Sequence, residues 1–178
     1  MRRHCDANDA NGVYFGGRDL VRCVGPPPIP GPAGEVQRSY AAQKDNLLKT
    51  AEIMPADLYQ YKPTPDMRTF ARVVNHVTEA QVQGCGAVNG TPPAERMKSP
   101  ADTTDKATIV AGLKASFAEC DKAYGSTTDA NFTELLSIGP AKRTRAGVLW
   151  GNASHDTHAP GCIKTIASPA NLQVKNYR

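Results

Sequence analysis

The sequence FARVVNHVTEAQVQGCGAV, residues 70–88, carries a strong helical pattern. Its apolar residues, which recur at spacings of three and four, are Phe70, Val73, Val74, Val77, Ala80 and Val88. That spacing places them on one face of a helix, and Asn89-Gly90 is typical of a helix end. The segment therefore predicts a helix that buries one face and carries His76 on or beside that face.

Three further segments have the same periodicity. One helix is expected from Glu35 to Met54, where Pro55 stops it, and the last helix is expected to begin near Thr144. Between them, a helix ending near Gly125 carries Ile109, Val110, Leu113, Phe117, Cys120 and Tyr124. Residues 129–136 predict a short extra helix, and no segment alternates as a strand would. Four long helices predict an all-α fold, a four-helix bundle that buries one stripe from each helix.

Composition limits the class of protein. The 178 residues suffice for one main domain, and 40% hydrophobic with 21% charged residues is ordinary for a soluble protein. No apolar run approaches the roughly 20 residues of a membrane helix, and the amino end lacks the apolar segment of a signal peptide. The net charge of +4 comes from scattered Lys and Arg, which argues against nucleic acid as a partner. A cytoplasmic protein that binds neither membrane nor nucleic acid is expected.

Prolines and glycines set the domain boundaries. The run GPPPIPGPAG at residues 25–34 cannot sustain helix or sheet hydrogen bonds. We therefore expect residues 1–34 to form a disordered or extended leader, residues 35–167 to form the bundle, and residues 168–178 to form an irregular tail.

The five cysteines are odd in number, widely spaced and without a Cys-x-x-Cys motif. This pattern predicts neither a disulfide framework nor a zinc ribbon, and reduced thiols are expected. Cys85 and Cys120 fall on apolar helix faces, where a cysteine usually serves as a small buried hydrophobic residue. Cysteine chemistry near His76 is an alternative that rests on composition alone.

Two histidines of the last helix, His155 and His158, stand three residues apart and therefore share a face. The inward stripe of that helix is predicted to be Val148, Leu149, Asn152, His155, and His158 or Ala159. Burying an unpaired imidazole costs about 1–3 kcal/mol, and a shared metal ion removes that cost by using the ring lone pairs. A divalent-metal site formed by His76, His155 and His158 is the hypothesis. The alternative stays open, because single helical histidines are more often half-exposed than ligating.

Two neighbours of the histidine pair are polar. Asn152 and Asp156 are candidates for hydrogen bonds that orient the imidazole rings. For Asp156, a solvated position on the outside of the helix is the expectation that we favour.

Several motifs together resemble a known family. They are YAAQKDNLL at 40–48, YKPTPDMRTF at 61–70, VNHV at 74–77 and GVLWGNASHDTH at 147–158. Together they resemble the DinB superfamily of bacterial proteins, over residues 35–158. The resemblance implies a four-helix bundle with a divalent metal, often zinc or nickel, held by one histidine of the second helix and two of the last. These positions correspond to His76, His155 and His158.

The end of the chain departs from the family pattern. Family members continue the last helix past its second histidine, whereas here Ala159-Pro160-Gly161 follows. A proline inside a helix removes one hydrogen bond and costs about 3 kcal/mol. The last helix is therefore expected to kink or end at Pro160.

Two functional hypotheses follow from the resemblance. Related branches of the family include S-transferases and isomerases that use mycothiol or bacillithiol. The resemblance therefore implies a metal-dependent thiol S-transferase or a related small-molecule transferase. A low-molecular-weight thiol is the implied partner. No general base or other catalytic residue is identified. The alternative is a non-catalytic bundle with a structural metal site or none, either alone or in a homodimer.

Overall fold

The computed structural model describes residues 30–167, with side chains described as far as Asp156. Residues 1–29 and 168–178, which include most of the predicted leader and the whole predicted tail, lie outside the described residues. The elements are α1 (Pro32–Ile53), η1 (Ala56–Leu58), α2 (Phe70–Val88), η2 (Pro93–Glu95), α3 (Lys106–Gly125), β1 (Leu135–Ile138), β2 (Ala141–Thr144) and α4 (Arg145–Ala167). None of the described helices combines the length and apolarity needed to cross a membrane.

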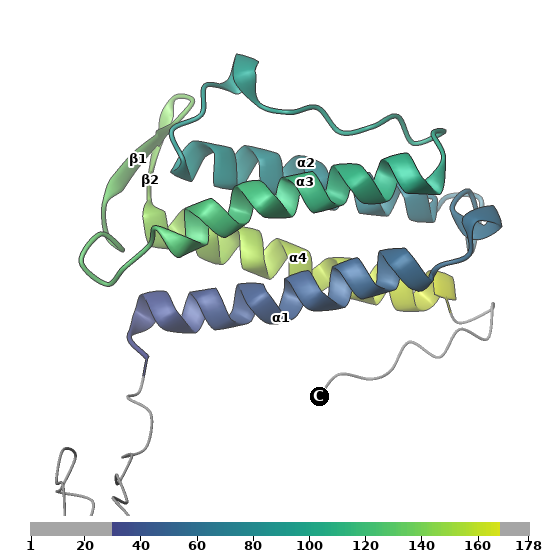
Figure 1. The fold of residues 1–178 in the computed structure, drawn as a ribbon, viewed down its shortest axis with the longest axis horizontal. Coiled ribbons are helices and arrows are strands. Elements are labelled where there is room, and N and C mark those ends of the chain that lie inside the picture. Colours follow the sequence, from purple (N-terminus) through teal and green to yellow (C-terminus); the bar gives the residue numbers. More distant parts are fainter. Residues whose placement is uncertain (1–29, 168–178) are drawn as a thin grey trace, which may run out of the picture. The chain divides into compact units, whose positions relative to one another are not determined.

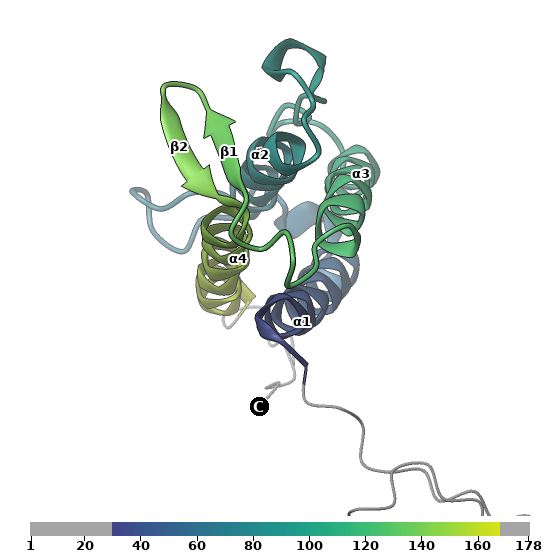
Figure 2. The same cartoon turned by 90° about the vertical axis from the view of Figure 1, so that its left-hand side faces the viewer.

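The four long helices form a bundle, as predicted. Helices α1 and α2 each pack against both α3 and α4, so α1 and α2 are diagonal to each other (Figure 2). Helices α1 and α4 run in one direction and α2 and α3 in the other, because the segment at 89–105 crosses back along the bundle (Figure 1). Antiparallel α2 and α4 therefore lie side by side, and these are the helices that carry the predicted ligands.

Local signals explain where the helices begin. Thr69 caps α2 by accepting the backbone N–H of Arg72, and Asp105 caps α3 by accepting that of Thr108. Helix α1 begins at Pro32, three residues before the expected Glu35, because proline is well tolerated in the first turn of a helix.

Aromatic and aliphatic side chains fill the space between the helices. The fully or almost fully buried residues include Leu47, Phe70, Val77, Ile109, Leu113, Phe117, Tyr124 and Leu149. Tyr40 of α1 stacks on Tyr124 of α3 with ring centroids 3.9 Å apart. Each large apolar side chain buried in this way contributes about 1.5–3 kcal/mol to stability. The packed core therefore fixes the positions of the helices relative to one another.

The short helix predicted for residues 129–136 is wrong. Turns lead instead into a hairpin in which β1 pairs antiparallel with β2, with Leu135 opposite Thr144 and Ile138 opposite Ala141. Gly139 has a φ of +58° at the hairpin turn, a conformation that glycine adopts without strain. The hairpin strands carry no alternating pattern of apolar residues, because only Leu136 and Ile138 of β1 pack against the core.

The last helix was expected to kink or end at Pro160. An end there is wrong, since α4 continues to Ala167. A proline removes a single hydrogen bond from the helical ladder. The turns on either side of Pro160 keep their helical backbone as far as Ala167, the last of the described residues.

Cys85 and Cys120 form a disulfide that joins α2 to α3, with Cα atoms 4.9 Å apart. Both residues are completely buried, as predicted, but the expectation of reduced thiols is wrong for this pair. Sequence spacing could not reveal the bond, because it depends on how two parallel helices are aligned. Disulfide sulfurs also carry no thiol, which removes the alternative of nucleophilic chemistry at these cysteines.

Candidate metal centre

His76 of α2 and His155 of α4 face each other across the interface of these two helices. Their Nε2 atoms are 3.1 Å apart, and the rings meet at 63° with centroids 4.9 Å apart. About 40% of the His76 side chain and 36% of the His155 side chain remain exposed. Two of the three predicted ligands therefore meet at an accessible edge of the bundle.

A carboxylate lies behind each imidazole. Nδ1 of His76 is 3.8 Å from Oε2 of Glu79, one turn along α2. Nδ1 of His155 is 3.5 Å from Oδ1 of Asp156. Each ring thus turns Nδ1 toward a negative group and Nε2 toward the other ring, which is the usual arrangement behind a metal-ligating histidine.

Glu79 is held in place by polar partners. Arg72 donates to both of its carboxylate oxygens at 2.8 Å, and the Ser99 hydroxyl donates to Oε1 at 3.0 Å. The Arg72 hydrogen bonds keep the pKa of Glu79 below its usual value. Glu79 therefore stays ionised behind His76, with much of its charge balanced by Arg72.

Asp156 lies inside the bundle, so the expectation that it is solvated on the outside of the helix is wrong. The side chain is completely buried. Its Oδ2 accepts a hydrogen bond from Nε2 of Gln81 at 3.2 Å. The buried stripe of α4 runs through Leu149, Asn152, Ala153 and Asp156, which places His155 at the edge of the stripe and not at its centre.

Asn152 has a different role from the one considered for it. Its Oδ1 accepts a hydrogen bond from the Tyr124 hydroxyl at 2.9 Å and lies 3.8 Å from Sγ of Cys85. Gly84 of α2 faces Asn152, and a Cβ added at Gly84 would lie in ordinary van der Waals contact with it. Among the described contacts, Asn152 ties α4 to α3 and does not orient an imidazole.

Burial and nearby positive charge favour the neutral form of His76. Burial lowers the pKa of His76, and His155, Arg68 and Arg72 lower it further, against a smaller opposing effect of Glu79. A neutral imidazole retains the lone pair that a metal ion requires. The electrostatics of the site therefore favour the ligating form of this residue.

The third predicted ligand, His158, lies on the helical backbone of α4 one turn beyond His155. Its side chain is outside the described part of the structure. Among the side chains described between residues 30 and 156, no group of three or more His, Cys, Asp or Glu residues could hold a metal ion. The structure thus brings together His76 and His155 and leaves the place of His158 as a prediction.

The comparison with protein families decides the identity of the bundle. The model of the DinB superfamily matches residues 39–159. The chain belongs to the DinB superfamily. A comparison with curated proteins finds no match.

Solved structures of other DinB-like proteins share the fold. A DinB-like protein from Bacillus cereus superposes with a TM-score of 0.65 at 15% identity, covering 82% of this chain and 97% of that one. A DinB-like protein from Bacillus subtilis gives 0.65 at 14% identity, with 81% and 97% covered. A mutant of a mycothiol-dependent maleylpyruvate isomerase gives 0.58 at 12% identity, with 73% of this chain and 60% of the isomerase covered. At these identities, the likeness concerns the fold.

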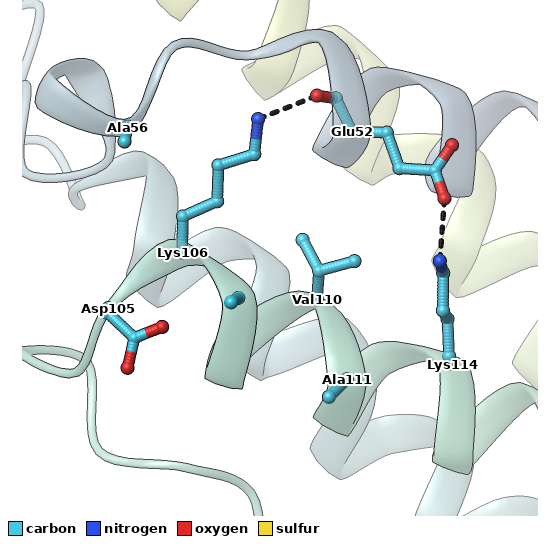
Figure 3. Close-up of a pocket in the computed structure, with 8 residues that line it drawn as sticks. Glu52, Ala56, Asp105, Lys106, Val110, Ala111 and Lys114 are labelled. Carbon is cyan, nitrogen blue, oxygen red and sulfur yellow. Dashed lines mark hydrogen bonds and ion pairs between the residues drawn. The ribbon is translucent and has the colours of Figure 1, made fainter.

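A surface cavity of about 600 Å³ lies between α1 and α3 (Figure 3), and neither His76 nor His155 lines it. Its charged side chains already have partners. Lys114 pairs with the Glu52 carboxylate at 2.8 Å, Lys106 donates to the Glu52 carbonyl at 2.6 Å, and Asp105 caps α3 through Thr108. The remaining lining residues are apolar, and the charged ones are already used in ion pairs, hydrogen bonds and a helix cap. We therefore assign the cavity no function.

Sequence reasoning missed two residues behind the histidines. Glu79 stands three residues after His76, so its approach to that ring was readable from helical spacing. Gln81 is a fully buried amide on the apolar face of α2, and a polar residue at such a position signals a buried partner. That the partner is Asp156 follows only from the alignment of α2 with α4.

The donor set fits a divalent metal ion. Two imidazole nitrogens bound to one tetrahedral zinc at about 2.0–2.1 Å lie roughly 3.3 Å apart. The observed Nε2–Nε2 distance of 3.1 Å is close to this value. In addition, Nδ1 of His155 and Oδ1 of Asp156 are buried without a hydrogen-bond partner.

Proposed function

We propose that this DinB-superfamily protein binds one divalent metal ion, zinc or nickel, through His76, His155 and His158. The observation that carries the proposal is the pair of Nε2 atoms that face each other at 3.1 Å with a carboxylate behind each ring. Zinc and nickel both accept imidazole nitrogen. His158 enters as the third ligand from its position one turn beyond His155 and from the family resemblance.

The placement of protons on the two rings supports a cation between them. If each Nδ1 carries a proton directed at its carboxylate, both Nε2 atoms carry lone pairs, which repel at 3.1 Å. A single N–H···N bond between the rings avoids this repulsion. However, the ring that donates this bond has its proton on Nε2, so its Nδ1 lone pair faces the carboxylate of Glu79 or Asp156, which is also unfavourable. When both imidazoles are neutral, a metal ion bound to both Nε2 atoms satisfies all four groups.

The proposed reaction is transfer of a low-molecular-weight thiol to a small electrophile, or a related small-molecule transfer. A divalent ion held by three imidazoles supplies a Lewis acid with an open coordination position, which activates a thiol or water near neutral pH. The exposure of His76 and His155 gives small molecules access. The fold shared with a mycothiol-dependent isomerase is consistent with thiol chemistry.

The rival proposal is a structural metal, or none, in a bundle without catalytic activity. A metal that links His76 to His155 would hold α2 against α4, either in one chain or in a homodimer. The two proposals differ in how much folding stability the metal provides and in whether a thiol is consumed.

We keep the cytoplasm as the proposed compartment, without a membrane or nucleic acid as partner. Disulfides are rare there because cellular thiols reduce them. The Cys85–Cys120 bond has no exposed surface, so a thiol cannot reach it without opening the bundle.

Metal analysis tests the binding proposal. We expect the full chain, purified without a histidine tag, to contain close to one zinc or nickel ion, and His76→Ala, His155→Ala and His158→Ala each to lose it. His4→Ala is the matched control, because His4 is not a predicted ligand, and it should keep the metal. Retention of a full complement of metal by all three variants would contradict the proposal.

A conjugation assay tests the reaction. Mycothiol, bacillithiol and glutathione are each incubated with a chromogenic electrophile and metal-loaded protein, with His76→Ala as the control for uncatalysed addition. Turnover with one thiol that disappears in the variant supports the transferase. Equal rates with and without wild-type protein for all three thiols favour the structural metal.

A further inference from the structure

Asp156 is a buried carboxylate whose polar partners are incomplete. It is completely buried, and Gln81 donates to its Oδ2. Its Oδ1 has no hydrogen-bond partner among the described atoms. Removing a carboxylate from water costs several kcal/mol unless it is well paired. We therefore expect Oδ1 of Asp156 to have a hydrogen-bond donor close by.

The neighbouring buried atom without a partner is Nδ1 of His155. It lies 3.5 Å from Oδ1 of Asp156, slightly beyond a good hydrogen bond. A small rotation of either side chain would join the two groups. An ionised carboxylate can only accept, so this contact is favourable only when Nδ1 carries the proton.

A chain of hydrogen bonds fixes the carboxylate from the other side. Because Asp156 accepts, the Gln81 amide must turn its NH₂ group toward Oδ2, at 3.2 Å. The Gln81 oxygen then accepts from the Ser116 hydroxyl of α3. Gln81 and Ser116 are completely buried as well. The chain runs from α3 through α2 to α4 and leaves Oδ1 directed at the imidazole.

We infer that Asp156 is a positioning residue that keeps the proton of His155 on Nδ1, so that Nε2 retains its lone pair for the metal ion. The inference rests on the proposed metal-binding function. It adds the residue that determines the tautomer of one ligand, His155. Carboxylates behind ligating histidines typically change metal affinity 10- to 100-fold.

Glu79 differs from Asp156 and serves as the matched control. It stands behind the other ring, but 38% of its side chain is exposed and Arg72 binds both of its oxygens. Solvent and Arg72 already balance its charge. Neutralising Glu79 should therefore change metal affinity much less than neutralising Asp156.

The first experiment measures the zinc affinity of the full chain by competition with a chromogenic chelator. We expect Asp156→Asn to weaken zinc binding about 10- to 100-fold and Glu79→Gln to weaken it only a few-fold, about the effect of a screened surface charge. Equal affinities of Asp156→Asn and wild type would overturn the inference.

The second experiment needs no metal. Nitrogen-15 NMR of the His155 ring in the metal-free protein reports which nitrogen carries the proton, and we expect Nδ1 in wild type. The double variant Asp156→Leu/Gln81→Leu removes both buried partners together, which limits the loss of stability, and its proton should move to Nε2. A wild-type proton on Nε2 would overturn the inference without any variant.

The two proposals fail differently. A wild-type protein that binds no zinc but shows the expected tautomer, with the shift in the double variant, contradicts the metal function and supports the positioning role. A protein that binds zinc through His76 and His155, with affinity insensitive to Asp156→Asn, keeps the metal function and refutes the role of Asp156.

Discussion

Cys85 and Cys120 join α2 to α3 inside the core, next to Asn152 and one turn from Gln81. The bond closes a loop across 35 residues of sequence. In the chain-entropy description, such a loop restricts the unfolded state by roughly 3–4 kcal/mol. Helix α2, which carries His76, is thus joined to α3 by a covalent link as well as by packing.

Replacing both cysteines by alanine should therefore lower the free energy of unfolding by roughly 3–4 kcal/mol, as measured by urea denaturation. Wild type unfolded in the presence of a strong reductant is the control and should approach the stability of the variant. The native protein should resist the same reductant because both sulfurs are buried. Unchanged stability in the variant would show that the bond contributes little.

Tyr124 links α3 to α4 through its hydroxyl, which lies 2.8 Å from the Leu149 carbonyl and 2.9 Å from Oδ1 of Asn152. Tyr124→Phe leaves the buried Oδ1 of Asn152 without this donor and should cost about 1–3 kcal/mol. Tyr61→Phe is the matched control, because the Tyr61 hydroxyl forms no hydrogen bond with a described residue. Equal thermal midpoints for the two variants would argue against this link.

Asp121 gives a prediction about acid stability. Partial burial raises its pKa, but hydrogen bonds from Lys44 and Tyr40 outweigh that effect and hold the pKa below the ordinary value of 3.8. Because the pKa is lower in the folded state, the stabilisation is present above pH 3.8 and is lost as the pH falls through the folded-state value. The pair with Lys44 is partly exposed, which limits the effect to about 1 kcal/mol or less.

Asp121→Asn should therefore lower the free energy of unfolding at pH 7 by about 1 kcal/mol or less. The difference in free energy of unfolding between variant and wild type should shrink below pH 3.8. Urea denaturation at a series of pH values measures this difference. Asp45→Asn is a suitable control, since Asp45 pairs with Lys49 within α1 alone. A difference from wild type that grows on acidification would reverse the assigned sign.

Chelation separates the two functional proposals. Ligand binding stabilises the folded state by about 4 kcal/mol when its free concentration is a thousand times its dissociation constant. Differential scanning calorimetry with and without a chelator should show a clear fall in the melting temperature for wild type. His76→Ala should show none. A very large fall, approaching unfolding of the apo form, would favour a structural metal.

The main helices were readable from the sequence because their signals are local. Thr69 and Asn89-Gly90 mark the two ends of α2, and periodic apolar residues mark its buried face. The approach of His76 to His155 also followed from amphipathic faces and the resemblance to the DinB superfamily. The helix ends and the buried faces depend on residues within a few turns of one another, whereas the approach of the two histidines was expected from the resemblance.

Features that depend on helix alignment were not readable. Asp156 was expected outside, but the buried stripe of α4 is rotated so that Asp156 is fully buried and His155 is half-exposed. The Cys85–Cys120 bond and the Gln81–Asp156 contact likewise require the register between helices. The hairpin escaped prediction because its strands are four residues each and only partly packed.

The most direct test of the central claim is X-ray absorption spectroscopy of the metal in the untagged, full-length protein. We expect three imidazole nitrogens at about 2.0–2.1 Å, falling to two in His76→Ala whenever metal is retained. A metal coordinated mainly by sulfur or carboxylate oxygen, or a wild-type imidazole signal unchanged by His76→Ala, would contradict it.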